Sequence, residues 1–215
     1  MKVRRLSVRD ALEFTPDVHR DERGFFVSPF EGTAFASHGG APAFPVAQAS
    51  FSVSRRGAVR GVHVTRTPPG MAKYVYCAHG RARDIVVDLR VGSPTFGRWD
   101  AVELDAQNPR AVYVPVGVGH AFAALEDGTL MTYLMSGPYV PANELAVSPV
   151  DPELALRLGG LPDPIMSGRD LTAPSLAEAM AANLLPDHAS CARAEELLWR
   201  NAPNQDAPGR DARGR

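Results

Sequence analysis

Lysine is the residue type that this chain most nearly lacks. Of its 23 basic residues only two are lysines, Lys2 and Lys73, and the others are arginines. Codon drift in a GC-rich genome explains the arginine bias, and Lys2 stands at a terminus where little constrains it. Lys73 lies in the middle of the chain, where drift alone would favour arginine. Its retention therefore indicates a specific requirement for a lysine.

Other features are missing as well. No run of 18 apolar residues is present, so the sequence contains no membrane-spanning helix. The basic N-terminus has no apolar run behind it and does not resemble a signal peptide. The two cysteines, Cys77 and Cys191, do not form a disulfide framework. With a net charge of -1, the sequence predicts a cytoplasmic protein with neither a nucleic-acid nor a membrane partner.

Glycine and proline are abundant instead. There are 19 of each in 215 residues, which favours a turn-rich β fold over a helical bundle. Short β-rich segments recur at a spacing of about 8–12 residues, which is typical of an antiparallel sandwich or barrel. Their number favours an all-β, cupin-like jelly roll. The predicted strands are Phe44–Ser54, Ala58–Thr65, Lys73–Ala78, Arg83–Arg90, Arg98–Asp105, Ala111–Val114, His120–Leu125 and Thr129–Met135.

The pattern changes after about residue 150. Two segments, SLAEAMAANLL and CARAEELLWR, place apolar residues at helical spacing, and Ser175 with Glu178 forms a capping-box pattern. These short C-terminal helices are expected to pack on the outside of the β domain. The predicted organisation is a jelly-roll domain over residues 1–185, a C-terminal helix over 186–203 and a disordered tail over 204–215.

A histidine-containing β-sandwich first suggests a metal-dependent cupin isomerase or oxygenase. Such a site needs two histidines two residues apart on one strand, a nearby carboxylate and a later histidine. His63 is instead followed by Val64 and Thr65, and no carboxylate stands at ligand spacing from it. The pattern argues against a metal site, and metal analysis of the purified protein would test this alternative.

The residues around His63 indicate acid–base chemistry. Arg60 precedes it, Lys73 opens the next strand, and His120 and Tyr133 follow on later strands. Arginine and lysine bind anionic oxygens, a neutral histidine accepts a proton and a tyrosine returns one. Each residue also has an ordinary structural interpretation. The composition and spacing by themselves leave both an enzyme and a catalytically silent binding domain open.

Seven segments, in order and over roughly residues 10–185, carry a more specific signal. They resemble the dTDP-4-dehydrorhamnose 3,5-epimerases and their relatives in antibiotic deoxysugar pathways. The segments are DERGFF (21–26), VAQASFSVSRRGAVRGVH (46–63), PPGMAKYVYC (68–77), ARDIVVDLRVGSPTFGRW (82–99), YVPVGVGHAFAALED (113–127), YLMSGPYVPANE (133–144) and DP (151–152).

The resemblance implies an isomerase that is a jelly-roll homodimer and needs neither a metal nor an organic cofactor. The substrate would be a dTDP-linked 4-keto-6-deoxyhexose, inverted at carbon 3, at carbon 5 or at both. The product would serve deoxysugar and antibiotic biosynthesis, or alternatively rhamnose synthesis. A silent sugar-nucleotide-binding protein is the third possibility, but it would have no use for an acid–base pair.

The resemblance also implies roles for individual residues. His63 matches the base, Asp170 its orienting carboxylate, Tyr133 the acid and Lys73 the group beside the enolate oxygen. In the family the DERGFF strand crosses to the neighbouring subunit, so Arg23 and Phe26 would serve the partner's site. The predicted substrate-binding residues are Arg23, Phe26, Gln48, Ser50, Arg60, His120, Tyr139 and Glu144.

Two local features qualify this match. Arg60 and His63 would point to opposite faces of an ideal strand, so both can reach one pocket only if the chain bulges at Gly61.

The rhamnose enzymes usually read RGLHYQ where this chain reads RGVHVT, and Ser50 replaces an amide. A smaller residue at Val64 suggests extra room for an altered sugar substituent.

Overall fold

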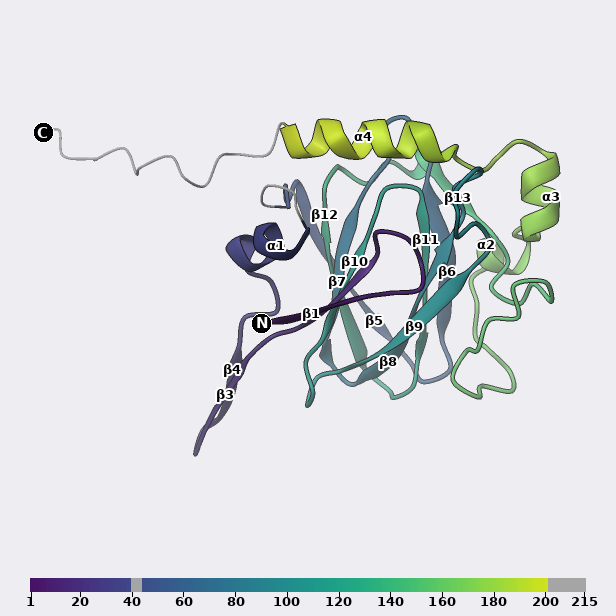
Figure 1. The fold of residues 1–215 in the computed structure, drawn as a ribbon. Helices are drawn as coiled ribbons and strands as arrows, with labels where there is room; N and C mark the ends of the chain where they lie inside the picture. Colours follow the sequence, from purple (N-terminus) through teal and green to yellow (C-terminus); the bar gives the residue numbers. More distant parts are fainter. Residues whose placement is uncertain (40–43, 201–215) are drawn as a thin grey trace, which may run out of the picture.

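The computed structural model describes residues 1–39 and 44–200, and the predicted tail of residues 204–215 lies outside them. This part of the chain forms two facing sheets and a separate hairpin (Figure 1). From edge to edge, the first sheet holds β1 (Lys2–Arg5), β2 (Leu12–Thr15), β10 (Ala111–Val114), β7 (Lys73–His79), β12 (Thr129–Met135) and β5 (Gln48–Ser54). The second sheet holds β13 (Glu144–Ala146), β6 (Val59–Thr65), β11 (Val118–Ala124), β8 (Arg81–Asp88) and β9 (Trp99–Asp105). The hairpin pairs β3 (Val18–Asp21) with β4 (Gly24–Val27).

The architecture confirms the predicted all-β jelly-roll sandwich. Each predicted strand is present, with its ends displaced by a few residues at most. The structure adds β1, β2, β3 and β13, which the turn pattern did not reveal, and β4 overlaps the DERGFF segment that the resemblance gave as a strand. Strands β1 and β3 are largely exposed and so lack an alternating apolar pattern, β2 is only four residues long and mostly buried, and β13 is three residues long.

Apolar side chains fill the space between the two sheets. Met131 from the first sheet and Phe122 and Val86 from the second belong to this inter-sheet core. On β8, Ile85 and Val87 point the other way, into a second cluster on the outer face of the second sheet. Because side chains alternate along a strand, β8 is buried on both faces, as its continuous apolar run predicts.

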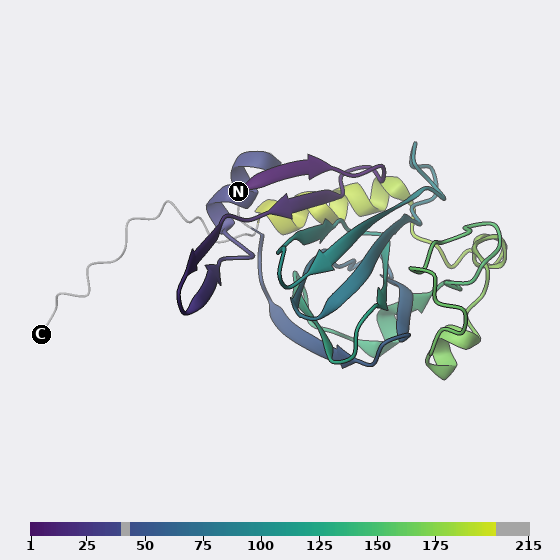
Figure 2. The same cartoon turned by 90° about the horizontal axis from the view of Figure 1, so that it is seen from below.

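The C-terminal helices cover the outside of the sandwich, as expected (Figure 2). Helix α3 (Leu176–Ala181) begins after Ser175, whose hydroxyl accepts a bond from the Glu178 amide at 3.2 Å. The Ser175 amide donates to the Glu178 carboxylate at 2.8 Å, which confirms the capping box. The remaining helices are α1 (Gly32–Gly39), the short η1 (Pro141–Asn143), α2 (Gly168–Leu171) and α4 (His188–Arg200).

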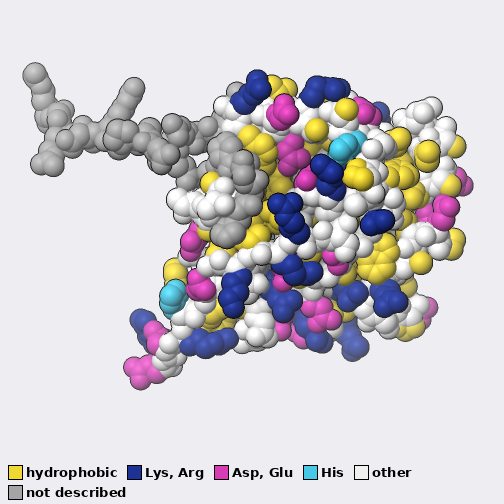
Figure 3. All heavy atoms as spheres, in the orientation of Figure 1, with side chains coloured by type: hydrophobic (Ala, Val, Ile, Leu, Met, Phe, Trp, Pro, Cys, Tyr) yellow, Lys and Arg dark blue, Asp and Glu magenta, His cyan; other side chains and the backbone are white. Residues whose placement is uncertain are grey.

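The surface carries charges of both signs. Figure 3 shows acidic and basic side chains interspersed with hydrophobic ones over one face. This mixture agrees with the net charge of -1, and no single-sign field dominates that face. Among the helices described, none is both long and apolar enough to cross a bilayer.

Helix α4 is attached to the outer face of the first sheet by aromatic packing. The Trp199 ring centroid lies 5.6 Å from that of Phe35 and 6.1 Å from that of Tyr113. The Tyr113 hydroxyl also donates a hydrogen bond to the Glu195 carboxylate. Burial raises the pKa of Glu195 to about 7, so a charge on this carboxylate opposes the docking of α4.

Glu195→Gln is therefore expected to stabilise the protein at pH 8 by about 1–3 kcal/mol and to change little near pH 4. In the unfolded chain Glu195 ionises near 4.5, whereas the folded state keeps its proton up to about 7. The free energy of unfolding that Glu195 costs the protein therefore grows as pH rises from about 4.5 to about 7. Urea unfolding at both pH values measures the effect, with exposed Glu196→Gln as the control. Equal shifts for the two variants would contradict the explanation.

Candidate active site

A cavity of about 310 Å³ opens among the strands of both sheets. Strands β5, β7 and β12 contribute from the first sheet, and β6, β11 and β13 from the second. Most of the predicted site residues line it. The lining comprises Gln48, Ser50, Ser52, Arg60, His63, Met71, Lys73, His120, Phe122, Tyr133, Met135, Tyr139 and Glu144.

His63 and Asp170 form a hydrogen-bonded pair at this cavity. The His63 Nε2 lies 2.6 Å from the Asp170 Oδ1, and the Asp170 side chain is only 2% exposed. Asp170 belongs to the one-turn helix α2 rather than to a plain loop. Its amide donates to the hydroxyl of the N-cap residue Ser167 at 3.2 Å. The helix thus fixes the carboxylate against β6.

The protonation state of His63 suits a base. Burial lowers its pKa, Asp170 opposes that change, and the charges of Lys73 and Arg169 lower the pKa further. The net direction is downward from 6.5, so the imidazole is neutral at pH 7. A carboxylate only accepts hydrogen bonds, so Nε2 carries the proton and Nδ1 keeps a lone pair.

A bulge at Gly61 brings Arg60 to the same cavity as His63. Across the β6–β11 pair, His63 faces His120 and Arg60 faces Phe122, so β6 has one extra residue in this interval. Gly61 has a φ of 113°, and a Cβ there would lie 2.4 Å from the His120 carbonyl oxygen. Only glycine fits this position. The predicted bulge is therefore confirmed.

Tyr133 approaches the cavity from the opposite sheet. Burial raises the pKa of its hydroxyl, which is therefore protonated at neutral pH. The hydroxyl lies 3.1 Å from that of Ser52, a cavity residue that the sequence analysis did not identify. A protonated hydroxyl on β12 thus lies across the cavity from a neutral imidazole on β6.

His120 has a carboxylate partner that was not predicted. Its Nε2 lies 2.6 Å from the Asp84 Oδ1 of the neighbouring strand β8, and both side chains are buried. Asp84 directly precedes the apolar run Ile85–Val86–Val87, which was the available signal. The other acid on that strand, Asp88, accepts a hydrogen bond from the Arg90 Nε at 2.9 Å.

Lys73 and Glu144 face the same cavity from β7 and β13. Burial lowers the pKa of Lys73, and the Glu144 charge opposes that change. Within residues 1–39 and 44–200, no carboxylate lies within ion-pair distance of the Lys73 ammonium. The ammonium is thus available to an oxygen of a bound molecule.

Gln48, Ser50 and Tyr139 form one polar edge of the cavity. The Gln48 amide donates to the Ser50 hydroxyl at 3.0 Å and accepts from the Tyr139 backbone at 2.8 Å. Tyr139 is 49% exposed, so its ring lies at the rim. An exposed aromatic ring at a polar rim is suited to stacking on a planar base.

Arg23 and Phe26 lie away from this cavity. They belong to the β3–β4 hairpin, which projects from the sandwich (Figures 1 and 2). Arg23 forms an exposed ion pair with Asp21, and Phe26 is 67% exposed. Their expected role in a partner's site stays a prediction.

Val64 does not border the cavity either. Its side chain is 1% exposed and packs with Ile85 and Val87 on the outer face of the second sheet. The suggestion that a small residue at position 64 enlarges the sugar pocket is therefore wrong. In an extended strand, Val64 faces away from the surface that carries His63.

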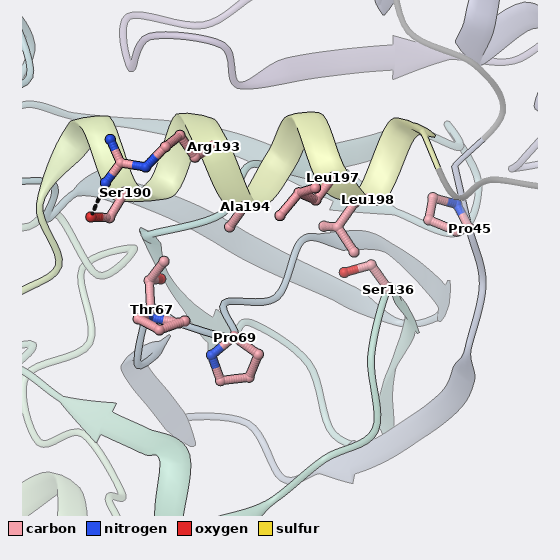
Figure 4. A pocket seen from close by; sticks show the side chains of 10 residues that line it. Pro45, Thr67, Pro69, Ser136, Ser190, Arg193, Ala194, Leu197 and Leu198 are labelled. Carbon is pink, nitrogen blue, oxygen red and sulfur yellow. Dashed lines mark hydrogen bonds between the residues drawn. The ribbon is translucent and has the colours of Figure 1, made fainter.

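A larger cavity of about 580 Å³ lies elsewhere, between α4 and the turn that joins β6 to β7 (Figure 4). Its walls are mostly apolar, from Pro69, Ala194 and Leu197, with Arg193 as its charged residue. It offers no acid–base pair, so its size does not make it the reactive site.

Among the described residues, no group of three His, Cys, Asp or Glu side chains could hold a metal ion.

The known proteins that this chain resembles include epimerases of sugar nucleotides. The family model for dTDP-4-dehydrorhamnose 3,5-epimerase matches residues 5–178. A dTDP-4-dehydrorhamnose 3,5-epimerase of Mycolicibacterium smegmatis is 47% identical, covering 94% of this chain and 98% of the relative. NovW, a 4-keto-6-deoxy sugar epimerase from the novobiocin gene cluster of Streptomyces spheroides, superposes with a TM-score of 0.86 at 46% identity, covering 89% and 95% of the two chains. ChmJ, a 3'-monoepimerase of Streptomyces bikiniensis solved with dTDP-quinovose, gives a TM-score of 0.86 at 42% identity, covering 91% and 98%.

Proposed function

The chain belongs to the dTDP-4-dehydrorhamnose 3,5-epimerase family and is an epimerase of dTDP-4-keto-6-deoxysugars, and from this premise we propose how its residues carry out the reaction. The proposal is proton removal and return through an enolate, at carbon 3, carbon 5 or both. The observation that carries it is the His63–Asp170 pair on one side of the cavity, with Tyr133 on the other.

His63 acts as the base. The 4-keto group acidifies the hydrogens on its two neighbouring carbons. The lone pair on His63 Nδ1 takes one of these protons, and the C–H electrons form a carbon–carbon double bond while negative charge moves to the ketone oxygen. Asp170 stabilises the resulting imidazolium at 2.6 Å, and Lys73 places its ammonium beside the developing oxyanion.

Tyr133 completes the inversion. Its hydroxyl gives a proton to the same carbon from the opposite face, the double bond opens and the ketone reforms. The imidazolium and the phenolate then return to their starting states by proton exchange with solvent. Placement of acid and base on facing sheets supports this division of roles.

The nucleotide end of the substrate is assigned to the polar edge. We expect Arg60 to bind the diphosphate with its guanidinium and Tyr139 to stack on the thymine. Gln48 and Ser50 would fix this end through their hydrogen bonds. His120 and Glu144 would contact the sugar.

A homodimer is part of the proposal. The exposed Phe26 on the projecting hairpin and the exposed Phe51, 71% accessible on the edge strand β5, support a partner surface there. Arg23 and Phe26 would then close the nucleotide pocket of the other subunit. Light scattering after gel filtration measures the oligomeric state, and a monomer in solution would contradict the proposed homodimer.

Proton NMR of dTDP-4-keto-6-deoxyglucose with the enzyme in deuterated water tests the function directly. Deuterium at carbon 3 alone would identify a 3-epimerase, and deuterium at both carbons a 3,5-epimerase. No exchange into this sugar, or into its deoxy and amino analogues, would contradict the epimerase assignment for these substrates.

Tyr133→Phe is expected to separate the two halves of the reaction. The variant keeps the His63 base, so deuterium still enters the substrate on the original face. It lacks the acid, so formation of the inverted product falls by about 10²–10⁴-fold. Exchange and product are measured in the same NMR sample, with Tyr76→Phe on the outer face of the sheet as the control. If Tyr133→Phe lost exchange and inversion equally, Tyr133 would not act solely as the acid.

A further inference from the structure

Thr65 is buried beside the cavity but does not border it. It is 4% exposed and pairs in register with Glu144 across the β6–β13 ladder. Its hydroxyl donates to the Glu144 Oε1 at 2.7 Å, a short bond to a carboxylate. One oxygen of this cavity carboxylate is thus tied to a side chain that holds no charge.

Glu144 and Lys73 share the cavity without touching. The charges of the two side chains act on each other, yet no ion pair joins them within the described chain. A glutamate side chain has three rotatable bonds, so an unanchored carboxylate in a low-dielectric cavity would move toward the nearest free cation. The bond from Thr65 opposes that movement.

We propose that Thr65 is a positioning residue that holds the Glu144 carboxylate off the Lys73 ammonium and so keeps this ammonium free for the ketone oxygen of the substrate. The inference rests on the proposed function for the identity of that oxygen. It concerns a residue at which this chain departs from the motif of the rhamnose enzymes. Thr65 acts through its hydrogen bond to Glu144 and does not line the cavity itself.

The other groups around Lys73 do not replace this arrangement. Arg169 of α2 lowers the pKa of Lys73, and burial lowers it more. His63 on β6 is neutral at pH 7, and β12, which pairs with β7 in the same sheet, presents the protonated Tyr133. Glu144 raises the pKa of Lys73, so its distance from the ammonium sets how far it offsets the lowering of that pKa by burial.

The scarcity of lysine makes the test unusually direct. The chain has only Lys2 and Lys73, so protein labelled with ¹³C at lysine Cε gives two side-chain signals, and Lys2→Arg leaves one. Titration of that signal reports the Lys73 pKa whether or not the enzyme turns over. Thr65→Val removes the hydroxyl at nearly constant volume, and Thr65→Ser keeps it.

Thr65→Val is expected to move the Lys73 titration upward by about 1 pH unit or more, because a released carboxylate closes on the ammonium. Turnover of dTDP-4-keto-6-deoxyglucose should fall about tenfold in kcat and in kcat/KM alike. Thr65→Ser should resemble the unaltered protein. With Glu144→Gln in the background, Thr65→Val should leave the Lys73 titration where Glu144→Gln alone puts it.

An unchanged Lys73 titration in Thr65→Val would overturn the proposal. It would also be overturned if Thr65→Val raised the Lys73 pKa by the same amount when Glu144→Gln was already present. If Thr65→Val does not fold, Thr65→Ala carries the same test. Deuterium exchange by the unaltered protein is judged separately. Its absence would remove the proposed function, whereas an unaltered titration in an active enzyme would remove only the role of Thr65.

Discussion

Replacement of His63 by alanine is expected to abolish measurable deuterium wash-in at either carbon, a loss of about 10²–10⁴-fold or more. In the proposed mechanism the imidazole, whose pKa burial lowers, is the neutral base, and Asp170 stabilises the positive charge that it acquires. Without the ring, the buried carboxylate of α2 faces the cavity alone. Proton NMR in deuterated water measures the loss on dTDP-4-keto-6-deoxyglucose.

The matched control is His79→Ala. His79 ends β7, is exposed and lies away from the catalytic cavity. The His79→Ala variant should catalyse deuterium exchange at the normal rate. The pH dependence gives a second readout, since kcat/KM of the unaltered protein should fall only below the lowered pKa of His63, which is under 6.5. Full exchange by His63→Ala would overturn the assignment of the base.

Lys73→Arg should reduce turnover by about 10²–10³-fold even though the positive charge is kept. An ammonium is a compact donor that fits against one oxygen, whereas a guanidinium is a wide planar fork. Lys73 lines the cavity of about 310 Å³ that the sugar would occupy in the proposed function, so a larger head group would compete with the sugar for space. Steady-state kinetics on the same sugar nucleotide measure the effect.

Lys2→Arg is the matched control, because it makes the same change at the terminus. Lys73→Met removes the charge and should be as inactive as Lys73→Arg. This equality is the informative result, since it separates shape from charge. Near-normal turnover by Lys73→Arg would refute shape as the reason why this chain keeps a lysine at position 73.

Much of the fold followed from local patterns. Turn residues separated each predicted strand, and the run Ile85–Val86–Val87 identified a strand buried on both faces. Period-2 geometry even required the bulge at Gly61, because Arg60 and His63 could not otherwise reach one cavity. Strand β1 was missed because its side chains are largely exposed on both faces, which leaves no apolar alternation, and β13 because it is only three residues long.

The site was less accessible to the same reasoning. Asp170 meets His63 only because α2 folds against β6, and spacing in the sequence carries no information about that contact. The resemblance supplied it. The Asp84–His120 and Ser52–Tyr133 bonds cross between strands in the same way, and register had to be known before either could be seen. The orientation of Val64 was predictable from alternation and was nevertheless misjudged.

The placement of His63 and Tyr133 on facing sheets has a consequence for substitutions in the protein interior. Phe122 both lines the cavity and belongs to the inter-sheet core, and Tyr133 packs against that core. In the proposed mechanism the distance from the Tyr133 hydroxyl to the sugar is therefore set by the thickness of this hydrophobic core. Volume changes at buried positions such as Met131 alter the gap between donor and acceptor. Under that mechanism, interior substitutions change the stereochemical outcome while every residue that lines the cavity stays in place.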